Sequence, residues 1–595
     1  ELNVNDNTTD TKLLLANLGV KYDILPSLSA EVRYQYQRTD RNSREYHDER
    51  SFYTRDLINR FTQLGSGSPV YVVPRGGILD LANTNQEGHM LRGQLNFNHE
   101  WRSKHEVAAI AGAELRQLHT LGNSYRVYGS DNHTGAANVD YVSLYPLITG
   151  GMDVIPAFAD FTGLLDRFVS VYLNAAYTYD DRYMVSASAR KDASNLFGVE
   201  TNRKGVPLWS SGIGWKISNE RFYNSSLLPY LNLRITYGAS GNVNNTITAL
   251  TTISRSPASF QNTNIPFAAI ANIANPNLRW EKVRTLNIGL DFALRDNRLS
   301  GSLEFYRKQS IDVIGLEPLD PTTGLGTMLT NSADVKGKGI EVQLHSQNIT
   351  GGAFKWQTSF ILNYADYKVG RYLSTAPTNG FVTDGGSINP LPGYNPYLVV
   401  SYKWAGLDPV TGDPQGYIDG HVSKDYDALT QAPINEQVIH GPALPPVSGN
   451  LLNTFAWKGI SLSANITYKL GYYFRRSTIA YGSLYASGAG HNDYLKRWRK
   501  PGDEKFTNVP SMIYPNPSFN RDNFYTYSDI TVEKGDHIRL EDIRLSYRYR
   551  NYQVYAYMSN LNALIWKANK AGLDPNAPSG LRPPRTIALG VKVDI

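Results

Sequence analysis

Apolar and polar residues alternate one for one in segment after segment of this chain, and this period of two is the strongest constraint on its fold. The clearest case spans residues 285–306. Leu286, Ile288 and Leu290 alternate there with polar or small residues. The alternation resumes after the turn at 295–298. Such a period, interrupted by an Asp-Asn turn, predicts a β-hairpin with one apolar and one polar face.

The same alternation recurs along the whole chain. We count about seventeen such strands and find no long amphipathic helix. In a soluble protein the apolar faces would meet a second sheet, whereas in an outer membrane they would meet lipid while the polar faces line a wet lumen. Besides the hairpin, the clearest strands are residues 13–24, 28–36, 91–101, 169–177, 183–189, 340–344, 356–362, 460–470 and 587–595.

One strand contains a phase slip. Ile538 and Leu540 occupy even positions, whereas Ile543 and Leu545 occupy odd ones. One extra residue near Glu541-Asp542 would restore the register, so a β-bulge is expected there.

The connections between strands fall into two classes. Short connections lie at 25–27, 102–104, 180–181, 295–298, 349–352, 458–459 and 550–551. Long polar segments alternate with them, at roughly 48–90, 117–166, 239–282, 308–338, 366–446 and 473–537. Tight periplasmic turns that alternate with long extracellular loops are typical of outer-membrane barrels, whereas a sandwich or propeller would have more uniform spacing.

Composition excludes several classes of protein. The 595 residues include no cysteine, so neither disulfides nor thiolate metal sites are available. The net charge of +6 is spread along the chain without a basic run, so nucleic acid is not indicated. No apolar run approaches the roughly 18 residues of a membrane helix, which excludes a helical membrane protein but not a membrane barrel. The 40 tyrosines suit a water–lipid boundary or a sugar-binding surface.

Chain direction suggests that strands are missing upstream. If the short turns are periplasmic, both the first strand (13–24) and the last (585–595) run towards the periplasm. Two such strands cannot pair antiparallel to close a ring. We therefore expect an odd number of strands before Glu1, which makes residues 1–595 the C-terminal portion of a larger barrel.

Signatures of catalysis and of bound cofactors are missing from the sequence. It contains no nucleophile elbow, phosphate loop, dinucleotide fingerprint or zinc-protease motif, so we expect no enzyme activity, no catalytic residues, no cofactor and no metal site. His99 and the His105-Glu106 pair flank a short turn and are expected to be polar rim residues. The segment His47–Arg50 is expected to be solvated loop surface. The acidic segment 408–417 could suggest a calcium-binding loop, but its spacing does not match an EF-hand. Turns built on its Pro and Gly residues explain the segment equally well.

Other polar and aromatic residues are candidates for contact with a cargo. Asp291 and Glu304 face the lumen in the predicted hairpin, where they would steer a ligand or hydrate the wall. Aromatic residues on the long loops could stack on sugar rings, although an interfacial girdle explains many tyrosines equally well. These aromatics include Tyr473, Phe474, Tyr481 and Tyr485, and the sequence assigns none of them as a binding residue.

Several segments resemble the SusC/RagA family of TonB-dependent outer-membrane transporters, which occur in Bacteroidetes-type Gram-negative bacteria. The most specific is "NPNLRWEKVRTLNIGLDFALRDNRLSGSLEFYRK" (275–308). The others are "LINRFTQ" (57–63), "PRGGILDL" (74–81), "RYMVSASARKDASNLFG" (182–198), "GVPLWSSGIGWKIS" (205–218), "KWAGLDPVTGDPQGY" (403–417), "GDHIRLEDIRLSY" (535–547) and "LRPPRTIALGVKVDI" (581–595).

This resemblance implies a transmembrane antiparallel barrel of 22 strands around an N-terminal plug. About five strands, the plug and the TonB-contacting segment would then be missing from this chain. It also implies a SusD-like surface lipoprotein as partner and energy from the TonB-ExbB-ExbD complex. The cargo would be an oligosaccharide or a peptide, and the barrel wall would contact outer-membrane lipid. The family usually ends on an aromatic residue, whereas this chain ends on Ile595.

Two other functions remain open from the sequence. A passive porin or a surface adhesin barrel would show the same strand pattern without a plug. A soluble β-rich glycan-binding protein is the third reading. The sequence does not identify the substrate or the residues that contact it.

Overall fold

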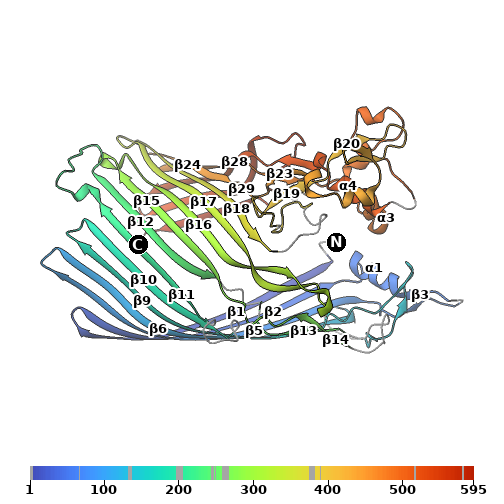
Figure 1. Ribbon diagram of the computed structural model, residues 1–595, viewed down its shortest axis with the longest axis horizontal. Helices are drawn as coiled ribbons and strands as arrows, with labels where there is room; N and C mark the ends of the chain where they lie inside the picture. Colours follow the sequence, from blue (N-terminus) through green and yellow to red (C-terminus); the bar gives the residue numbers. More distant parts are fainter. Residues whose placement is uncertain are drawn as a thin grey trace. The chain divides into compact units, whose positions relative to one another are not determined.

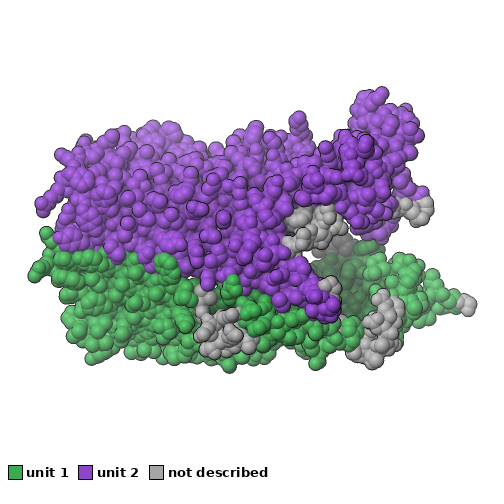
Figure 2. Space-filling view, viewed as in Figure 1, with its two compact units in different colours: residues 1–177, 186–209, 243–280 green, residues 178–185, 210–242, 281–595 purple. Residues whose placement is uncertain are grey.

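The computed structural model describes residues 4–65, 67–131, 137–195, 205–242, 247, 249–256, 267–373, 382–388, 390–514, 518–578 and 582–594. The expectation for Ile595 lies outside these residues. The chain divides into two compact units (Figure 2). Unit 1 comprises residues 1–177, 186–209 and 243–280, and unit 2 comprises residues 178–185, 210–242 and 281–595. Within the described ranges, no helix is both long and apolar enough to cross a bilayer.

Seventeen strands of the described residues belong to a large antiparallel sheet, as the sequence predicts. They are β1 (Asn5–Leu25), β2 (Leu28–His47), β5 (Gly77–Trp101), β6 (His105–Ser130), β9 (Asp160–Tyr179), β10 (Tyr183–Ser194), β11 (Gly205–Lys216), β12 (Tyr230–Asn242), β15 (Glu281–Ala293), β16 (Leu299–Pro318), β17 (Thr327–Ile349), β18 (Phe354–Tyr372), β24 (Val447–Trp457), β25 (Ile460–Leu470), β28 (His537–Tyr549), β29 (Tyr552–Lys567) and β30 (Thr586–Val593).

Unit 1 is built on four long strands that pair in the order β1–β2–β5–β6. A small hydrophobic core lies where these strands meet helix α1 (Phe52–Phe61). Ser51 begins the helix, because its hydroxyl accepts a hydrogen bond from the Thr54 amide at 3.2 Å. Leu57 and Phe61 of the helix pack against Ile78 and Tyr128 of the strands. The remaining short strands of unit 1 are β3 (Thr62–Gln63), β4 (Val70–Tyr71), β7 (Tyr145–Pro146), β8 (Met152–Asp153), β13 (Thr252–Ser256) and β14 (Phe267–Asn272).

Unit 2 is built on a continuous ladder, β12–β15–β16–β17–β18–β24–β25–β28–β29–β30, part of which is visible in Figure 1. The hairpin predicted for residues 285–306 is confirmed as β15 and β16. Leu290 pairs with Leu303 across the two strands, so apolar side chains share one face. Asp296 and Asn297 form the turn with φ of 60° and 52°, a conformation that Asp and Asn tolerate better than most residues.

The predicted bulge is also confirmed. Asp542 pairs with Asn465 and Leu540 pairs with Ile466, so Glu541 is the additional residue between them. The short turns all lie where the sequence predicts them. Arg102, Asp180, Lys458 and Arg550 occupy these turns with positive φ.

The limits expected for the long loops are wrong at several places. β5 begins at Gly77 rather than near residue 91, and β6 continues to Ser130 rather than ending near 117. Polar residues fill these extensions, as in the row Asn42–Asn83–Asn123 across β2, β5 and β6. Ladder hydrogen bonds join backbone groups and need no apolar side chains, so pairing continues where the hydrophobic alternation stops.

The longest connections of unit 2 contain elements of their own, gathered near one end of its strands (Figure 1). These are β19 (Leu398–Ser401), β20 (Trp404–Leu407), β21 (Pro414–Ile418), β22 (His421–Ser423), α2 (Tyr426–Thr430), β23 (Val438–Pro442), β26 (Tyr473–Arg475), α3 (Tyr481–Ser487), α4 (Phe519–Thr526) and β27 (Val532–Lys534). We call the described residues of 382–446 and 473–536 the loop region. It lies within the long polar segments expected at 366–446 and 473–537, and it contains short strands and helices.

Candidate functional site

The loop region has a packed interior that positions its surface. Tyr402, Leu429 and Phe524 form one buried cluster, and Tyr481 and Tyr525 belong to another. Trp404 packs against both clusters, so they form one continuous interior. Packed aromatic side chains of this size stabilise a loop region much as a domain core does.

Local sequence explains where the helices of the loop region start and stop. Ser518 precedes α4, and its hydroxyl accepts a hydrogen bond from the Arg521 amide at 3.3 Å. The Asp425 carboxylate accepts one from the Ala428 amide at 3.1 Å at the start of α2. Gly488 follows α3 with φ of 70°, the left-handed conformation that glycine adopts without strain.

Two buried arginines hold the segments of the loop region together. The Arg521 guanidinium donates to the Asp413 carboxylate at 2.9 Å and to the Ser511 carbonyl at 2.8 Å. The Arg475 guanidinium donates to the carbonyls of Val400 and Ser528 at 2.8 and 3.0 Å. Burial lowers the pKa of Arg475 to about 10, so it still carries its charge at neutral pH.

A large cleft opens on the surface of this region. Its main part has a volume of about 960 Å³ and lies between the segment 476–509 and residues 570–573. A second part of about 860 Å³ shares Ser477, His491 and Leu495 with the first, so the two form one cleft. Phe506 and Leu495 on its rim are 90% and 72% exposed. The volume of the cleft lies in the range of ligand-binding sites in proteins.

The cleft carries more positive than negative side chains. Its lining includes Arg476, Lys496, Arg497, Arg499 and Lys570 against Asp493, Asp503 and Glu533. This excess favours anionic groups in a ligand.

The carboxylate of Asp493 organises one wall of this cleft. It accepts hydrogen bonds from Arg476 and from the Thr478 hydroxyl, each at 2.9 Å. Burial alone would raise the pKa of Asp493, but the hydrogen bond from Thr478 and the charge of Arg476 outweigh it and lower the pKa.

Other cations of the cleft are not held by carboxylates. The Arg497 guanidinium lies 3.9 Å from the centroid of the Tyr494 ring. Within the described residues, Arg497, Arg499 and Lys570 have no carboxylate within 4.0 Å. These three side chains can therefore contact a ligand without breaking an ion pair.

The loop aromatics considered from the sequence divide into two groups. Phe474 is buried, and Tyr481 is 1% exposed with its hydroxyl donating to the Pro510 carbonyl at 2.7 Å, so neither offers a face for a sugar ring. Tyr473 packs beside His440, with 5.9 Å between ring centroids. Tyr485 packs edge-on against Tyr514. Its neighbour in the chain, Leu484, lines the second part of the cleft. The charged residues of the cleft gave no motif in the sequence and were not predicted.

The polar residues near the short turn at 102–104 form an aromatic row. His99 stacks on Trp101, and Trp101 stacks on His105 with 5.6 Å between centroids. The His105 Nδ1 lies 2.8 Å from the Tyr177 hydroxyl. The row lies beside the short turn, and aromatic side chains of this kind are common at the interfaces of membrane barrels.

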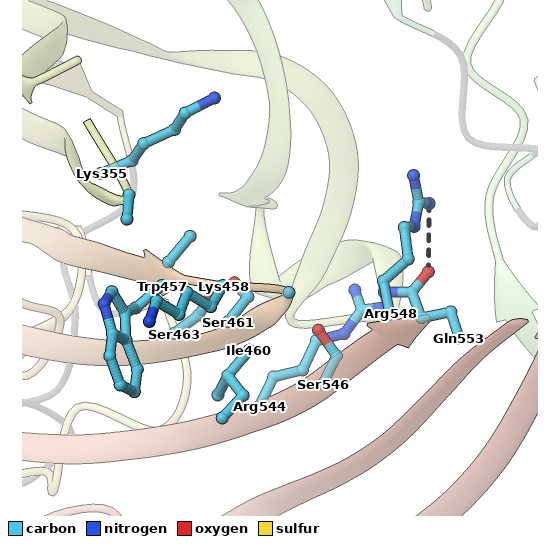
Figure 3. A pocket seen from close by; sticks show the side chains of 13 residues that line it. Lys355, Trp457, Lys458, Ile460, Ser461, Ser463, Arg544, Ser546, Arg548 and Gln553 are labelled. Atoms are coloured by element: carbon cyan, nitrogen blue, oxygen red, sulfur yellow. Dashed lines mark hydrogen bonds between the residues drawn. The ribbon is translucent and has the colours of Figure 1, made fainter. Parts of the chain in front are cut away.

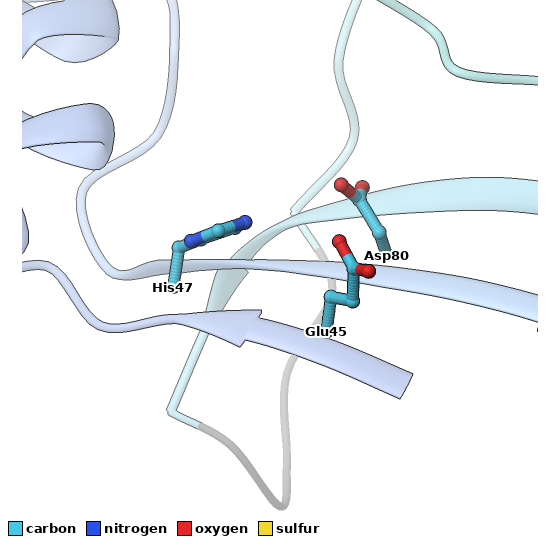
Figure 4. A group of neighbouring side chains, drawn as sticks. All are labelled: Glu45, His47 and Asp80. Carbon is cyan, nitrogen blue, oxygen red and sulfur yellow. The ribbon is translucent and has the colours of Figure 1, made fainter. Parts of the chain in front are cut away.

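Three potential metal ligands converge in unit 1. Glu45, His47 and Asp80 point towards one another (Figure 4), and their ligand atoms lie within 4.8 Å of one another. Asp80, however, already binds Arg126 with both oxygens at 2.6 Å. A cation would have to share Asp80 with a guanidinium, so we assign no metal to this group. The expectation of solvated loop surface is wrong for His47, which is the last residue of β2 and is partly buried. Beyond the strand, Asp48 and Arg50 form an ion pair.

The acidic segment 408–417 forms the turn expected from its Pro and Gly. The Asp408 carboxylate accepts hydrogen bonds from the amides of Val410 and Thr411 and from Lys424 at 2.7 Å. The Asp413 carboxylate binds Arg521. Both carboxylates are therefore engaged within the protein.

Asp291 and Glu304 lie on the polar face of the hairpin, as predicted. Arg234 on β12 binds both of them, with 2.7 Å from its Nε to Asp291 and 3.0 Å from its Nη2 to Glu304. Asn287 donates to the second oxygen of Glu304 at 3.0 Å. These two carboxylates thus belong to a structural ion-pair network on the wall, and they do not form an open site.

Comparison with known proteins gives a consistent family. Residues 2–561 match the family model described as TonB dependent receptor-like, beta-barrel. The chain is 24% identical over 592 residues to TonB-dependent receptor P26 of Formosa agariphila, covering 90% of this chain and 56% of that protein. It is 24% identical over 231 residues to the TonB-dependent receptor SusC of Bacteroides thetaiotaomicron, covering 38% of this chain and 23% of that protein.

A solved structure, that of the RagAB peptide transporter, shares the fold. Its TM-score is 0.76 at 18% identity, with 100% of this chain and 63% of that chain covered. The chain spans about half the length of the curated relatives that it matches. The resemblance to SusC and RagA seen in the sequence is confirmed. With its large antiparallel sheet and a family match over nearly its whole length, the chain belongs to the TonB-dependent receptor β-barrel family.

Proposed function

We propose that this chain is the C-terminal barrel portion, residues 1–595, of a TonB-dependent importer of nutrient oligomers in the outer membrane of a Bacteroidetes-type bacterium. The complete protein would close a barrel of 22 strands around a plug that precedes this chain. The family is one of transporters and receptors rather than enzymes. In this mechanism the barrel forms and breaks no covalent bonds.

The observation that carries the proposal is the combination of a two-faced wall with a charged cleft at its loop end. The apolar rows of β15 and β16, with Leu290 opposite Leu303, suit contact with lipid. The polar rows, such as that of Asp291 and Glu304, suit a hydrated interior. The cleft of the loop region has a rigid base on which a ligand can be captured with little ordering of the chain.

The proposed cargo is a glycan or a peptide, and the proposed partners are a SusD-like lipoprotein and the TonB-ExbB-ExbD complex. Relatives named SusC and RagA support this assignment. The lipoprotein would deliver the oligomer to the loop region. Energy from TonB would then rearrange the plug, and the ligand would pass along the polar faces of the strands.

Uptake in the native host tests this function. Labelled oligomers from glycan and peptide libraries should enter wild-type cells, and uptake should stop both in cells that lack this gene and in cells that lack TonB. Uptake that needs the gene but continues unchanged without TonB would contradict the proposal and favour a passive pore. Absence of any uptake defect in the gene deletion would favour an adhesin. Recovery of the protein in the soluble fraction without detergent would exclude all barrel readings.

A further inference from the structure

A second basic pocket lies beside the short turns at 458–459 and 550–551 of unit 2 (Figure 3). These turns are at the ends of β24 and β25 that are opposite to the loop region. Its volume is about 550 Å³. Its lining comes from the ends of β18, β24, β25, β28 and β29. The lining residues that matter for the argument are Lys355, Lys458, Ser461, Ser463, Arg544 and Arg548.

Strand register places most of these side chains on the polar face. Lys355 pairs with Ala456, which pairs with Ser461 on the next strand, and Ser463 pairs with Arg544. Because neighbours across a ladder point to the same side, these side chains share one face. Phe455, Leu462 and Leu545 occupy the opposite, apolar face. In a barrel of this family the polar face borders the interior, so the pocket faces the space that the proposed plug and a passing cargo share.

The pocket is positive, and of its four cations only Arg548 has a carboxylate nearby among the described residues. Lys355, Lys458, Arg544 and Arg548 line it, and none of its lining residues is Asp or Glu. Arg548 lies at the edge, with 3.9 Å between its Nη2 and an oxygen of Asp594. In the part of the chain that the structure describes, the other three cations have no carboxylate within 4.0 Å. A bound anion would offset this excess of positive charge.

Neutral polar groups line the pocket beside the four cations, although the Ser463 hydroxyl already shares a hydrogen bond with Thr454 at 2.9 Å and Gln553 accepts one from Arg548 at 3.4 Å. The hydroxyls of Ser461, Ser463 and Ser546 and the amide of Gln553 line the pocket, and Ser546 is only 7% exposed. Cationic and hydroxyl donors together, without a competing acceptor of negative charge, match the hydrogen-bonding needs of sulfate, phosphate and carboxylate oxygens.

We propose that this pocket binds the acidic groups of an anionic oligosaccharide, sulfate or carboxylate, as it passes along the polar face. The route of the ligand rests on the function proposed above. The neutral donors suit sugar hydroxyls, and Arg544 lies 5.2 Å from the centroid of the Tyr555 ring, which adds an aromatic ring beside the cations. On the polar face the apolar lining is limited to Ala353 and Ala456, whereas Trp457 and Ile460, which also line the pocket, belong to the opposite face. The cations of the loop cleft would favour the same ligand at the other end of the path.

Binding in detergent tests the pocket without any transport step. The purified full-length protein is titrated by calorimetry with a heparin-derived tetrasaccharide, with maltotetraose as the uncharged probe and with tetraglutamate as the acidic peptide. The pocket variant is Lys355→Gln/Arg544→Gln. The matched control is Arg295→Gln/Arg298→Gln, which removes two exposed cations from another short turn of unit 2.

We expect the sulfated probe to bind, and its affinity to fall about five- to tenfold in the pocket variant but less than twofold in the control. Raising the salt concentration should weaken this binding in the wild type more than in the pocket variant. Equal affinity in wild type and pocket variant would overturn the proposal, as would equal binding of maltotetraose. Pocket-dependent binding of tetraglutamate without the sulfated probe would overturn the assignment to a saccharide. None of these outcomes depends on TonB, so failure here is distinct from failure of the uptake experiment.

Discussion

The apolar face of the β15–β16 hairpin should tolerate charge according to depth. Strands rise about 3.3 Å per residue and tilt about 40° in membrane barrels, so each residue advances roughly 2.5 Å along the membrane normal. Counted from Leu294 at the short turn, Phe292, Leu290 and Ile288 lie about 5, 10 and 15 Å into an apolar band about 25 Å tall. The midplane therefore falls between Leu290 and Ile288.

Arginine at Ile288 or Leu290 should then cost about 2–4 kcal/mol of folding free energy, and at Phe292 about 1 kcal/mol or less. Neighbours across the strands offer no counter-ion, because Ile288 faces Phe305 and Leu290 faces Leu303. Ser302→Arg is the matched control, since Ser302 pairs with Asp291 on the polar face at the same depth as Leu290.

Guanidinium titration of the full-length protein in lipid vesicles, followed by tryptophan emission and by heat-modifiable gel mobility, measures these costs. Ser302→Arg should unfold within about 1 kcal/mol of the wild type. A cost that is the same at Phe292 and at Leu290, or that is equal for Leu290→Arg and Ser302→Arg, would refute the assignment of this face to lipid.

Three further changes test other parts of the structure. Arg521→Met should destabilise the loop region by about 3 kcal/mol, because it takes from the Asp413 carboxylate its nearest cation, leaving only Lys424 at 3.9 Å, and removes a donor from the Ser511 carbonyl. Limited proteolysis should then cut the loop region faster, and unchanged cleavage would contradict the role of Arg521. Deletion of Glu541 should shift the pairing of β28 with β25 and impair assembly. The control Glu541→Ala keeps the extra residue and should assemble normally. Equal yields of folded protein for the two variants on heat-modifiable gels would contradict the bulge. Burial, with a smaller contribution from Arg475, lowers the pKa of His440 to about 4. Below about pH 6.5 the unfolded chain therefore binds a proton that the folded chain does not, and the stability of the loop region should fall between pH 6.5 and pH 4. The variant His440→Gln should flatten this part of the profile of stability against pH.

The wall could be predicted from the sequence because its rules are local. Alternation in residues 285–306 fixes the two faces of β15 and β16, the Asp-Asn pair fixes the turn, and the phase slip beside Glu541 fixes the bulge. What failed were the limits of the strands. Pairing along the row Asn42–Asn83–Asn123 depends on backbone hydrogen bonds that continue from the apolar part of the strands, and polar side chains leave no periodic signal there.

The interior of the loop region could not be predicted, because its contacts join residues far apart in the chain. Tyr402 and Phe524 pack with 5.6 Å between ring centroids although more than a hundred residues separate them. Tyr481 was considered as a surface platform, but it is a core residue whose hydroxyl is satisfied by a distant carbonyl. The cleft itself combines cations from segment 476–499 with Lys570, a set without a motif.

The pairing of cations in unit 2 separates structural charges from those available to a ligand. Arg521, Arg475 and Arg476 are buried or half-buried, and each is bound by carboxylates, carbonyls or hydroxyls of the protein. Removing a partner from such an arginine would lower the free energy of unfolding, so these contacts stabilise the loop region. Cations in the two concave sites differ: Lys570 in the cleft and Arg544 in the pocket have no carboxylate beside them in the described residues. Clustered unpaired cations do not stabilise a fold. Their placement in the two basic sites, at opposite ends of the unit 2 strands, is the arrangement that the proposed anionic ligand would need.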